Sequence, residues 1–256
     1  MIHPTAIIDP TARIAENVTI GPYSIIGPHV EIGEGTWIGP HVVIQGPSKI
    51  GKDNKIFQFA SVGEAPQDKK FTGENTLLEM GDRNVIRECC TLNRGTAQDK
   101  GTTKIGNDNL FMAYVHIAHD CVVGNNTIFA NNASLAGHVT IEDFVIMSGF
   151  SGVFQGCRMG TFSFAAMGAL VEKDVPPFVK VAEHYAKPFG LNTIGMKRRG
   201  FSDETMLSLK RAYKVIYRKG LTIKLALEEL EAMRAVCPEV QLYIDFIKSS
   251  ERGIVR

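Results

Sequence analysis

Three histidines within one 23-residue stretch are the side chains of this sequence best suited to chemistry near neutral pH. His116 and His119 occur in the segment VHIAHDC, and His138 follows in AGHV. A histidine can remove a proton from a hydroxyl or amine as that group attacks an activated acyl carbon. The sequence shows no nucleophile elbow and no Ser-His-Asp arrangement. These features favour direct acyl transfer over a covalent acyl-enzyme.

The surroundings of these histidines leave three interpretations open. Asp120 follows His119, and a turn at this point would let the carboxylate orient the imidazole ring. A zinc site is an alternative, but no cysteine or carboxylate array completes a convincing ligand set. The third interpretation is three surface histidines without a function. We expect no metal and no cofactor.

Polar side chains in two other segments fit the groups of a sugar nucleotide. Asp68 and Lys70 occur in QDKKF, where the carboxylate can accept bonds from sugar hydroxyls and the ammonium can meet a phosphate or acyl oxygen. Asn192, Arg198 and Arg199 occur in GLNTIGMKRRGF, and adjacent arginines can bind a diphosphate.

A basic cluster later in the chain contrasts with a nearly neutral remainder. Its members are Lys210, Arg211, Lys214, Arg218 and Lys219. An acidic partner could dock on this cluster, although a solvated helix face explains the charges equally well.

These candidate residues are set into a sequence with a six-residue period. Isoleucine occupies every sixth position from Ile2 to Ile56, and the apolar phase returns later, slips by one residue, and runs from Ile105 to Val171. Such a period fits neither a helix nor an ordinary strand. Three units of six would close a triangular coil of 18 residues, and stacked coils form a parallel β-helix. We expect Ile8, Ile26, Ile44, Ile117 and Ile141 to point inward.

Two polar segments interrupt this period, and a third region abandons it. The first loop covers residues 63–76 and the second loop covers residues 93–103; insertions at the corners of a solenoid often build the binding face. From about residue 200 the period becomes helical, with Ser202 and Thr222 as N-caps, Gly220 as a terminating glycine and Pro238 at a third helix start. We therefore expect a β-helix over residues 1–185 and a helical domain over residues 195–256.

Composition excludes several classes of protein. The chain has 256 residues and a net charge of +1, which argues against a nucleic-acid or anionic-membrane partner. The sequence predicts neither a signal peptide nor a membrane-spanning helix. Five cysteines without a CxxC pair indicate reduced thiols and a cytoplasmic location. Because a three-sided rod of this length suits cyclic symmetry, we expect a homotrimer.

The combination of the hexads with GEAPQDKKF, GDRNVIRE, HIAHDCVVGN, FANNASLAGHV, DVPPF and KRRGF resembles the cytoplasmic UDP-N-acetylglucosamine 3-O-acyltransferases that begin lipid A synthesis. The resemblance covers essentially the whole chain. It implies a left-handed β-helix, an exception to the usual right-handed crossover. It also implies a homotrimer with sites between neighbouring subunits, and a (3R)-3-hydroxyacyl donor carried on acyl carrier protein.

The same resemblance implies roles for individual residues. His119 matches the general base for the glucosamine 3-hydroxyl, and His116 and His138 match donors that hold substrate or the developing oxyanion. Asp68, Lys70 and Gln155 match substrate contacts, and Asn192, Arg198 and Arg199 match nucleotide and diphosphate contacts. Met167 matches the position that ends the acyl groove, where a bulky residue selects shorter chains.

Three positions depart from the family pattern. Phe154, Tyr185 and Ile194 stand where the family commonly has two histidines and an acidic residue. Loss of these polar groups raises the alternative that the acceptor is the 3-amino analogue of the sugar nucleotide. Two further classes compete: a later N-acyltransferase of the same pathway, which usually carries an extra N-terminal domain, and a non-acyltransferase β-helix protein, either a zinc enzyme or a trimeric scaffold.

Overall fold

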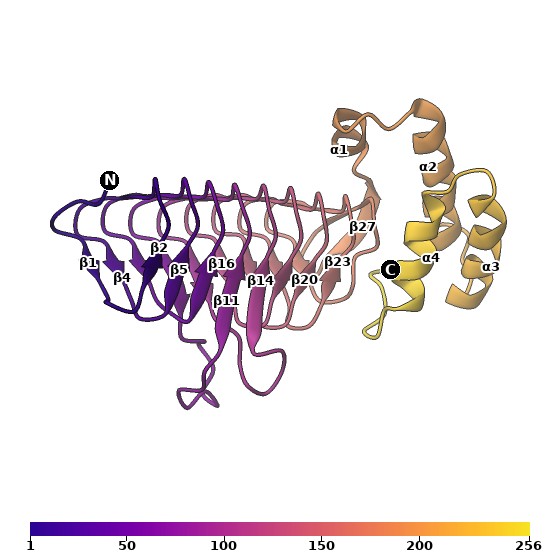
Figure 1. Cartoon of the computed structure of the whole chain (residues 1–256). Coiled ribbons are helices and arrows are strands. Elements are labelled where there is room, and N and C mark those ends of the chain that lie inside the picture. Colours follow the sequence, from indigo (N-terminus) through magenta and orange to yellow (C-terminus); the bar gives the residue numbers. More distant parts are fainter.

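The computed structural model describes residues 1–256. Figure 1 shows a rod of stacked coils that begins at the N-terminus, with a group of helices at its other end. Each coil contributes one short strand to each of three sheets, and all pairings between coils are parallel. The expected parallel β-helix is confirmed.

The three sheets form the three faces of the rod. Face 1 consists of β1 (Ile7–Ile8), β4 (Ile25–Ile26), β7 (Val43–Ile44), β10 (Ser61–Glu64), β13 (Thr91–Asn93), β16 (His116–Ile117), β19 (Ser134–Leu135), β22 (Gly152–Val153) and β25 (Leu170–Val171). Face 2 consists of β2 (Arg13–Ile14), β5 (Val30–Ile32), β8 (Ser48–Ile50), β11 (Leu77–Met80), β14 (Thr102–Ile105), β17 (Val122–Val123), β20 (Thr140–Ile141) and β23 (Arg158–Met159). Face 3 consists of β3 (Thr19–Ile20), β6 (Trp37–Ile38), β9 (Lys55–Ile56), β12 (Val85–Ile86), β15 (Leu110–Phe111), β18 (Ile128–Phe129), β21 (Ile146–Met147), β24 (Phe164–Ala165), β26 (Val179–Ala182) and β27 (Lys187–Leu191).

The register explains why the hexad phase slips once along the chain. Strand partners are usually 18 residues apart, as in Ile26 and Ile44. Across the first loop Ile50 pairs with Met80, a separation of 30 that keeps a multiple of six. Across the second loop Met80 pairs with Ile105, a separation of 25 that moves the phase by one. Both loops are therefore insertions that leave the stacking of the coils intact.

The inward hexad residues form the core of the rod. Ile26, Ile44, Ile117 and Ile141 are buried, which confirms their predicted orientation. Ile8 is only half-buried, and this part of the prediction needs correction. It lies in the first coil, which has no neighbour on its N-terminal side, so stacking covers it less completely.

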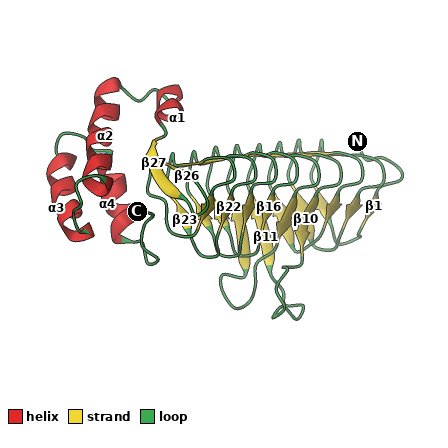
Figure 2. Cartoon of the chain, turned by 180° about the vertical axis from the view of Figure 1, so that it is seen from behind, coloured by secondary structure: helices red, strands yellow, loops and turns green.

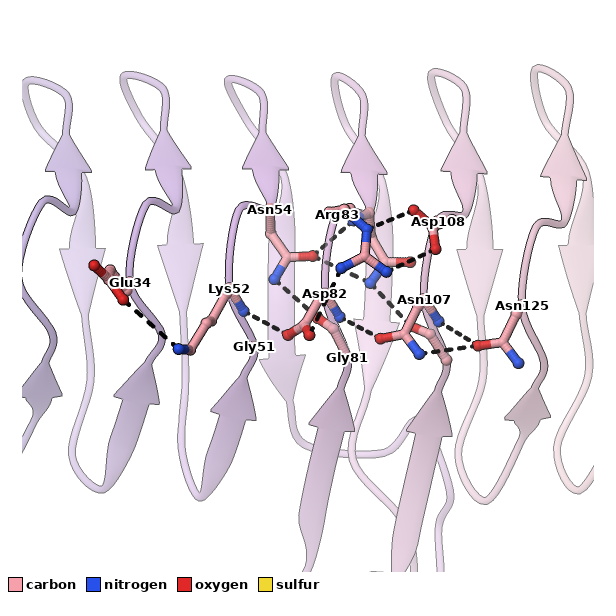
Figure 3. A network of polar contacts seen from close by, with 12 residues as sticks. Glu34, Gly51, Lys52, Asn54, Gly81, Asp82, Arg83, Asn107, Asp108 and Asn125 are labelled. Atoms are coloured by element: carbon pink, nitrogen blue, oxygen red, sulfur yellow. Dashed lines mark hydrogen bonds and ion pairs between the residues drawn. The ribbon is translucent and has the colours of Figure 1, made fainter.

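Two ladders of amide and carboxylate side chains run along the corner between faces 2 and 3 (Figure 3). In the outer ladder the Asp82 carboxylate accepts from the backbone N–H of Lys52, and Asn107 accepts from the N–H of Asp82. In the inner ladder Asn54, Asn84 and Asn109 are fully buried and stack from coil to coil. Each side chain satisfies backbone groups of its neighbours, which a turn in the interior of a β-helix would otherwise leave unpaired.

The helices lie beyond the last coils. They are α1 (Thr193–Arg198), α2 (Asp203–Tyr217), α3 (Ile223–Arg234) and α4 (Val240–Lys248). Ser202 and Thr222 are the N-caps of α2 and α3, as predicted, and Gly220 has a left-handed φ of 67°. Pro238 precedes the N-cap Glu239 of α4 rather than starting the helix. The sequence did not predict α1, which Asn192 caps.

Figure 2 shows the rod from behind, with both loops leaving it on the same side. The first loop joins β10 to β11, and the second joins β13 to β14. Strand β27 runs antiparallel to β26 and leads into α1. No helix has the length and apolar character needed to cross a membrane.

Candidate active site

A left-handed turn places His119 against a carboxylate. His119 follows strand β16, and Asp120 has a φ of 58°, so the two neighbouring side chains turn toward each other instead of pointing apart. The His119 Nδ1 atom lies 2.9 Å from the Asp120 Oδ2 atom. The carboxylate is fully buried, while the imidazole keeps 14% of its surface exposed. The predicted contact between Asp120 and His119 is confirmed.

The second loop fixes the Asp120 carboxylate in turn. The Thr96 hydroxyl donates to Oδ2 at 2.6 Å, and the Thr96 backbone N–H donates to both carboxylate oxygens at 3.0 and 3.1 Å. These donors hold the carboxylate in one position. It holds the proton of His119 on Nδ1, which leaves Nε2 free to accept a proton from a substrate.

Gly137 makes room for that free nitrogen. A Cβ atom at Gly137 would lie 2.6 Å from Cε1 and 2.7 Å from Nε2 of His119. Only a residue without a side chain fits beside the ring at this point. The next coil thus presents bare backbone to the Nε2 edge of His119.

His138 lies on that next coil, close to His119. Their ring centroids are 4.9 Å apart in an edge-to-face arrangement, and His138 Nδ1 lies 2.6 Å from Asp99 Oδ2 of the second loop. His119, His138, Asp68, Lys70 and Gln155 line one polar cavity of about 320 Å³. Further lining residues, which the sequence did not single out, are Gln67, Thr96 and Gln98. Their place on two irregular loops gave no pattern by which to find them.

The histidine cluster is poorly suited to a metal ion. Donor atoms of His119, Asp120 and His138 lie within 4.8 Å of one another. However, the Nδ1 atoms of both rings are bound to carboxylates, and Asp120 is occupied by Thr96 as well. Zinc needs at least three protein ligands, and only the two Nε2 atoms face the cavity unpartnered. The arrangement favours a hydrogen-bonded base.

His116 faces a different part of the surface. It lies on face 1, its Nδ1 atom is 2.7 Å from the Thr91 hydroxyl, and burial together with the nearby His119 lowers its pKa. It lines a groove of about 350 Å³ with small residues, among them Ser134 and Gly152, and with Phe154 and Leu170. This groove begins beside the histidine cluster and runs along face 1.

No thiol near the site can act as a nucleophile. Cys121 is fully buried, its Sγ lies 3.2 Å from the Ala136 carbonyl oxygen, and burial raises the pKa of this thiol to about 12. A cysteine with such a pKa is protonated and inert at neutral pH. This agrees with direct transfer rather than an acyl-enzyme.

The nucleotide-binding candidates lie in a second cavity. Asn192, Arg198 and Arg199 line a space of about 290 Å³ between face 3 and α1, together with Phe144 and Phe162. The Arg199 guanidinium stacks on Phe144 at 4.5 Å. The Asn192 amide bonds the Gly195 N–H and the Phe162 carbonyl, so in this chain it holds α1 in place. Within one chain, the candidate residues around His119 and the nucleotide-binding candidates therefore lie in two separate cavities, while His116 lines the groove on face 1.

The three expected departures from the family pattern are exposed. Phe154 and Tyr185 are 46% and 55% exposed, with ring centroids 6.5 Å apart, and Ile194 is 68% exposed on the rim of the second cavity. Met167 is also exposed, at the corner between faces 3 and 1, outside the groove that His116 lines.

Known proteins match this chain over its full length. A family model described as UDP N-acetylglucosamine O-acyltransferase, domain 2, matches residues 174–255, and a bacterial transferase hexapeptide model matches residues 1–33, 29–64 and 102–137. A Thiobacillus denitrificans protein named acyl-[acyl-carrier-protein]–UDP-N-acetylglucosamine O-acyltransferase is 58% identical over 100% of this chain and 99% of its own. A Janthinobacterium protein of the same name is 55% identical, with the same coverage.

Solved structures agree with these relatives. The UDP-N-acetylglucosamine acyltransferase of Francisella novicida has a TM-score of 0.98 and 45% identity, covering 100% of this chain and 94% of its own. The UDP-N-acetylglucosamine O-acyltransferase of Moraxella catarrhalis has a TM-score of 0.97 and 50% identity, with 100% and 99% coverage. These matches confirm the expected fold class, a left-handed parallel β-helix followed by C-terminal helices.

Proposed function

The chain belongs to the family of acyl-[acyl-carrier-protein]–UDP-N-acetylglucosamine O-acyltransferases, and we propose that it transfers a (3R)-3-hydroxyacyl chain to the 3-hydroxyl of UDP-N-acetylglucosamine, the first step of lipid A synthesis. The observation that carries this proposal is the ordered set Thr96–Asp120–His119, which leaves one imidazole nitrogen free at a polar cavity.

His119 acts as the general base in this mechanism. Its Nε2 atom removes the proton of the sugar 3-hydroxyl as the oxygen attacks the thioester carbonyl carbon. The new C–O bond gives a tetrahedral oxyanion, which a neighbouring donor such as His138 stabilises. Collapse of this species breaks the C–S bond, and the imidazolium returns its proton to the departing thiolate. The Asp120 carboxylate stabilises the imidazolium throughout.

The loop residues bind the acceptor. Asp68 and Lys70 lie in the same cavity as His119, where a carboxylate and an ammonium can bind sugar hydroxyls and an acyl or phosphate oxygen. Gln155 adds an amide from the coil that follows that of His138. Arg198 and Arg199 supply two guanidinium groups for the diphosphate, and Phe144 offers a stacking surface beside them.

A homotrimer would unite the two cavities. The outward residues of face 2 are largely charged: Arg13, Glu31, Lys49, Glu79 and Lys104. The outward residues of face 3 near the site are apolar: Val85, Leu110, Ile128, Ile146 and Phe164. An apolar face of this length is unfavourable in water. We propose that it packs on a neighbouring subunit and brings one chain's histidines to the other chain's arginines.

Acyl carrier protein is the proposed donor partner, and the exposed cations of α2 are its proposed docking surface. Arg211 and Lys214 line a groove between α2 and α3 and form no ion pair. Lys219, which the sequence grouped with them, is paired with Glu229. The available basic face is therefore smaller than the sequence indicated and centres on Lys210, Arg211, Lys214 and Arg218.

The cytoplasm is the proposed compartment. All five cysteines are free thiols, and four of them are buried. Reduced thiols are typical of a reducing compartment. Acyl carrier protein and sugar nucleotides would meet the enzyme there.

A second acceptor is a specific alternative. Phe154, Tyr185 and Ile194 present apolar or aromatic surface at positions where the resemblance noted in the sequence implies polar groups. The test is a transfer assay with UDP-N-acetylglucosamine and its 3-amino analogue, against a series of 3-hydroxyacyl carrier-protein thioesters. We expect the hydroxyl acceptor to be preferred. Preference for the amine would establish the alternative, and no transfer to either would refute the proposed function.

Met167 lies outside the groove that His116 lines in a single chain, so we propose that it limits the acyl chain in the assembled trimer, where face 3 packs on a neighbouring subunit. Each methylene buried in an apolar groove contributes about 0.8 kcal/mol, so a side chain that excludes several methylenes discriminates strongly. Met167→Gly should shift the preference in the same assay toward longer donors. A mutant with unchanged preference, or a wild type that already prefers the longest donor, would show that Met167 is not the stop.

A further inference from the structure

The second loop carries a carboxylate that the sequence patterns did not single out and that the proposed mechanism does not use. Asp99 Oδ2 lies 2.6 Å from Nδ1 of His138, although the two residues are 39 positions apart. We propose that Asp99 is a positioning residue for acyl transfer: it fixes the orientation and tautomer of His138 and so directs its Nε2 atom into the polar cavity. The inference rests on the proposed function.

The second loop is anchored well enough to hold such a residue. The Arg94 guanidinium donates to the carbonyl oxygens of Gly46 and Gly63 at 2.7 and 2.8 Å. Thr96 bonds the buried Asp120 through both its hydroxyl and its backbone N–H. Three residues further on, Asp99 reaches His138. A single loop therefore positions both histidines, one through Asp120 and the other directly.

The two histidine–carboxylate pairs differ in their environment. The Asp120 side chain has no exposed surface, whereas the Asp99 side chain is 35% exposed and its partner His138 is 26% exposed. Charge-assisted hydrogen bonds are strong, but solvent weakens a half-exposed pair. Asp99 should therefore matter less than Asp120 and more than an ordinary surface acid.

A carboxylate on Nδ1 determines what the other ring nitrogen can do. With its Nδ1–H donated to Asp99, His138 cannot rotate away from the cavity without breaking the bond. When the ring carries both protons, Nε2–H can donate to a substrate oxygen while Nδ1–H stays bound to Asp99. His119 lies edge-on at 4.9 Å, so a fixed His138 also limits the movement of the general base.

A double-mutant cycle on the full-length enzyme tests the proposal. Asp99→Ala should lower kcat/KM for the sugar nucleotide about tenfold, within the range of one lost charged hydrogen bond. Asp99→Asn keeps an acceptor oxygen and should recover part of this loss. In the His138→Ala background, Asp99→Ala should cost nothing further. The control is Lys100→Ala, an exposed neighbour on the same loop, which should behave as wild type.

A second measurement does not depend on activity. In the wild-type protein the 15N spectrum of the His138 ring should show a proton on Nδ1, and Asp99→Ala should shift the ring toward a mixture of tautomers. An unchanged spectrum, or equal losses in both backgrounds of the cycle, would overturn the inference. Failure of the proposed function is a different outcome: wild type itself would then transfer no acyl group.

Discussion

At the level of single residues, the site depends on the two ring nitrogens of His119: one is bound to a carboxylate, and the other is free to meet a substrate. Asp120 binds Nδ1 of His119, and a left-handed turn makes this contact possible between sequence neighbours. Gly137 leaves the space beside Nε2 open. Catalysis by a general base needs both conditions, because a ring that is unheld or covered cannot meet the substrate.

Gly137→Ala tests this requirement. The added Cβ would lie about as close to Nε2 as a hydrogen-bonded atom, so the imidazole must move; a displacement near 1 Å can cost ~10²-fold in rate. We expect kcat to fall by roughly that factor with little change in melting temperature. The control is Gly149→Ala, whose Cβ would meet only the Asn131 carbonyl oxygen at 3.4 Å. Equal activity in both variants would show that catalysis does not depend on open space beside Nε2 of His119.

The sequence predicted part of this site. His119 and Asp120 are adjacent, and His138 follows one coil later, so the hexad spacing alone brings the two histidines together. Thr96 and Asp99 could not be found in this way, because they lie on an irregular loop whose path no period describes. The contact between Asp99 and His138 depends on how that loop is anchored.

At the scale of elements, the hexads position the site and the ladders hold the coils in register. The strands are mostly two residues long, too short to resist slippage by themselves. Buried amides at the corner between faces 2 and 3 bond backbone groups of both neighbouring coils (Figure 3). The buried amides of the inner ladder should therefore contribute more to stability than the side chains of the outer ladder, whose hydrogen bonds water can replace.

Asn84→Ala measures the inner ladder. Its Nδ2 donates to Asn54 and to the Gly106 carbonyl, and its Oδ1 accepts from the Asn109 N–H. Removal leaves buried groups unpaired, so we expect a loss of about 2–4 kcal/mol in the free energy of unfolding. Asn107→Ala in the half-buried outer ladder should cost about 1 kcal/mol or less. Denaturant unfolding measures both losses in the free energy of unfolding. Equal losses would contradict a larger contribution from the inner ladder.

The helices show which elements the sequence pattern could predict and which it could not. The caps Ser202 and Thr222 were predicted correctly because each is a local signal that precedes a helical period. Helix α1 has only six residues, too few for a period to be visible. Its position depends on tertiary contacts instead: Asn192 bonds a backbone carbonyl of the rod, which is 30 residues earlier in the sequence.

At the scale of the whole molecule, the three faces are not equivalent. Charged residues cover much of face 2, whereas face 3 presents a row of branched and aromatic side chains. The homotrimer stays a prediction, as does the division of the chain near residues 185–195. Because the two cavities are separate in one chain, the predicted trimer would be needed to bring the residues of both cavities together.

Leu110→Arg tests the assembly. Leu110 points outward in the middle of face 3, and a charge buried in an apolar interface is strongly unfavourable. We expect light scattering to show trimers for wild type and monomers for this variant, with loss of activity. Thr140→Arg on the outward side of face 2 is the matched control and should remain trimeric and active. A wild-type monomer, or a trimeric Leu110→Arg variant, would contradict the proposed interface.

We propose that this molecule transfers an acyl group with His119 as its general base. The most direct test is the rate of transfer from a 3-hydroxyacyl carrier protein to UDP-N-acetylglucosamine by wild type and by His119→Ala. We expect an active wild type and a loss of ~10²–10⁴-fold in kcat for the variant, with an unchanged melting temperature. A variant that keeps more than about a tenth of the wild-type kcat would show that another group removes the proton.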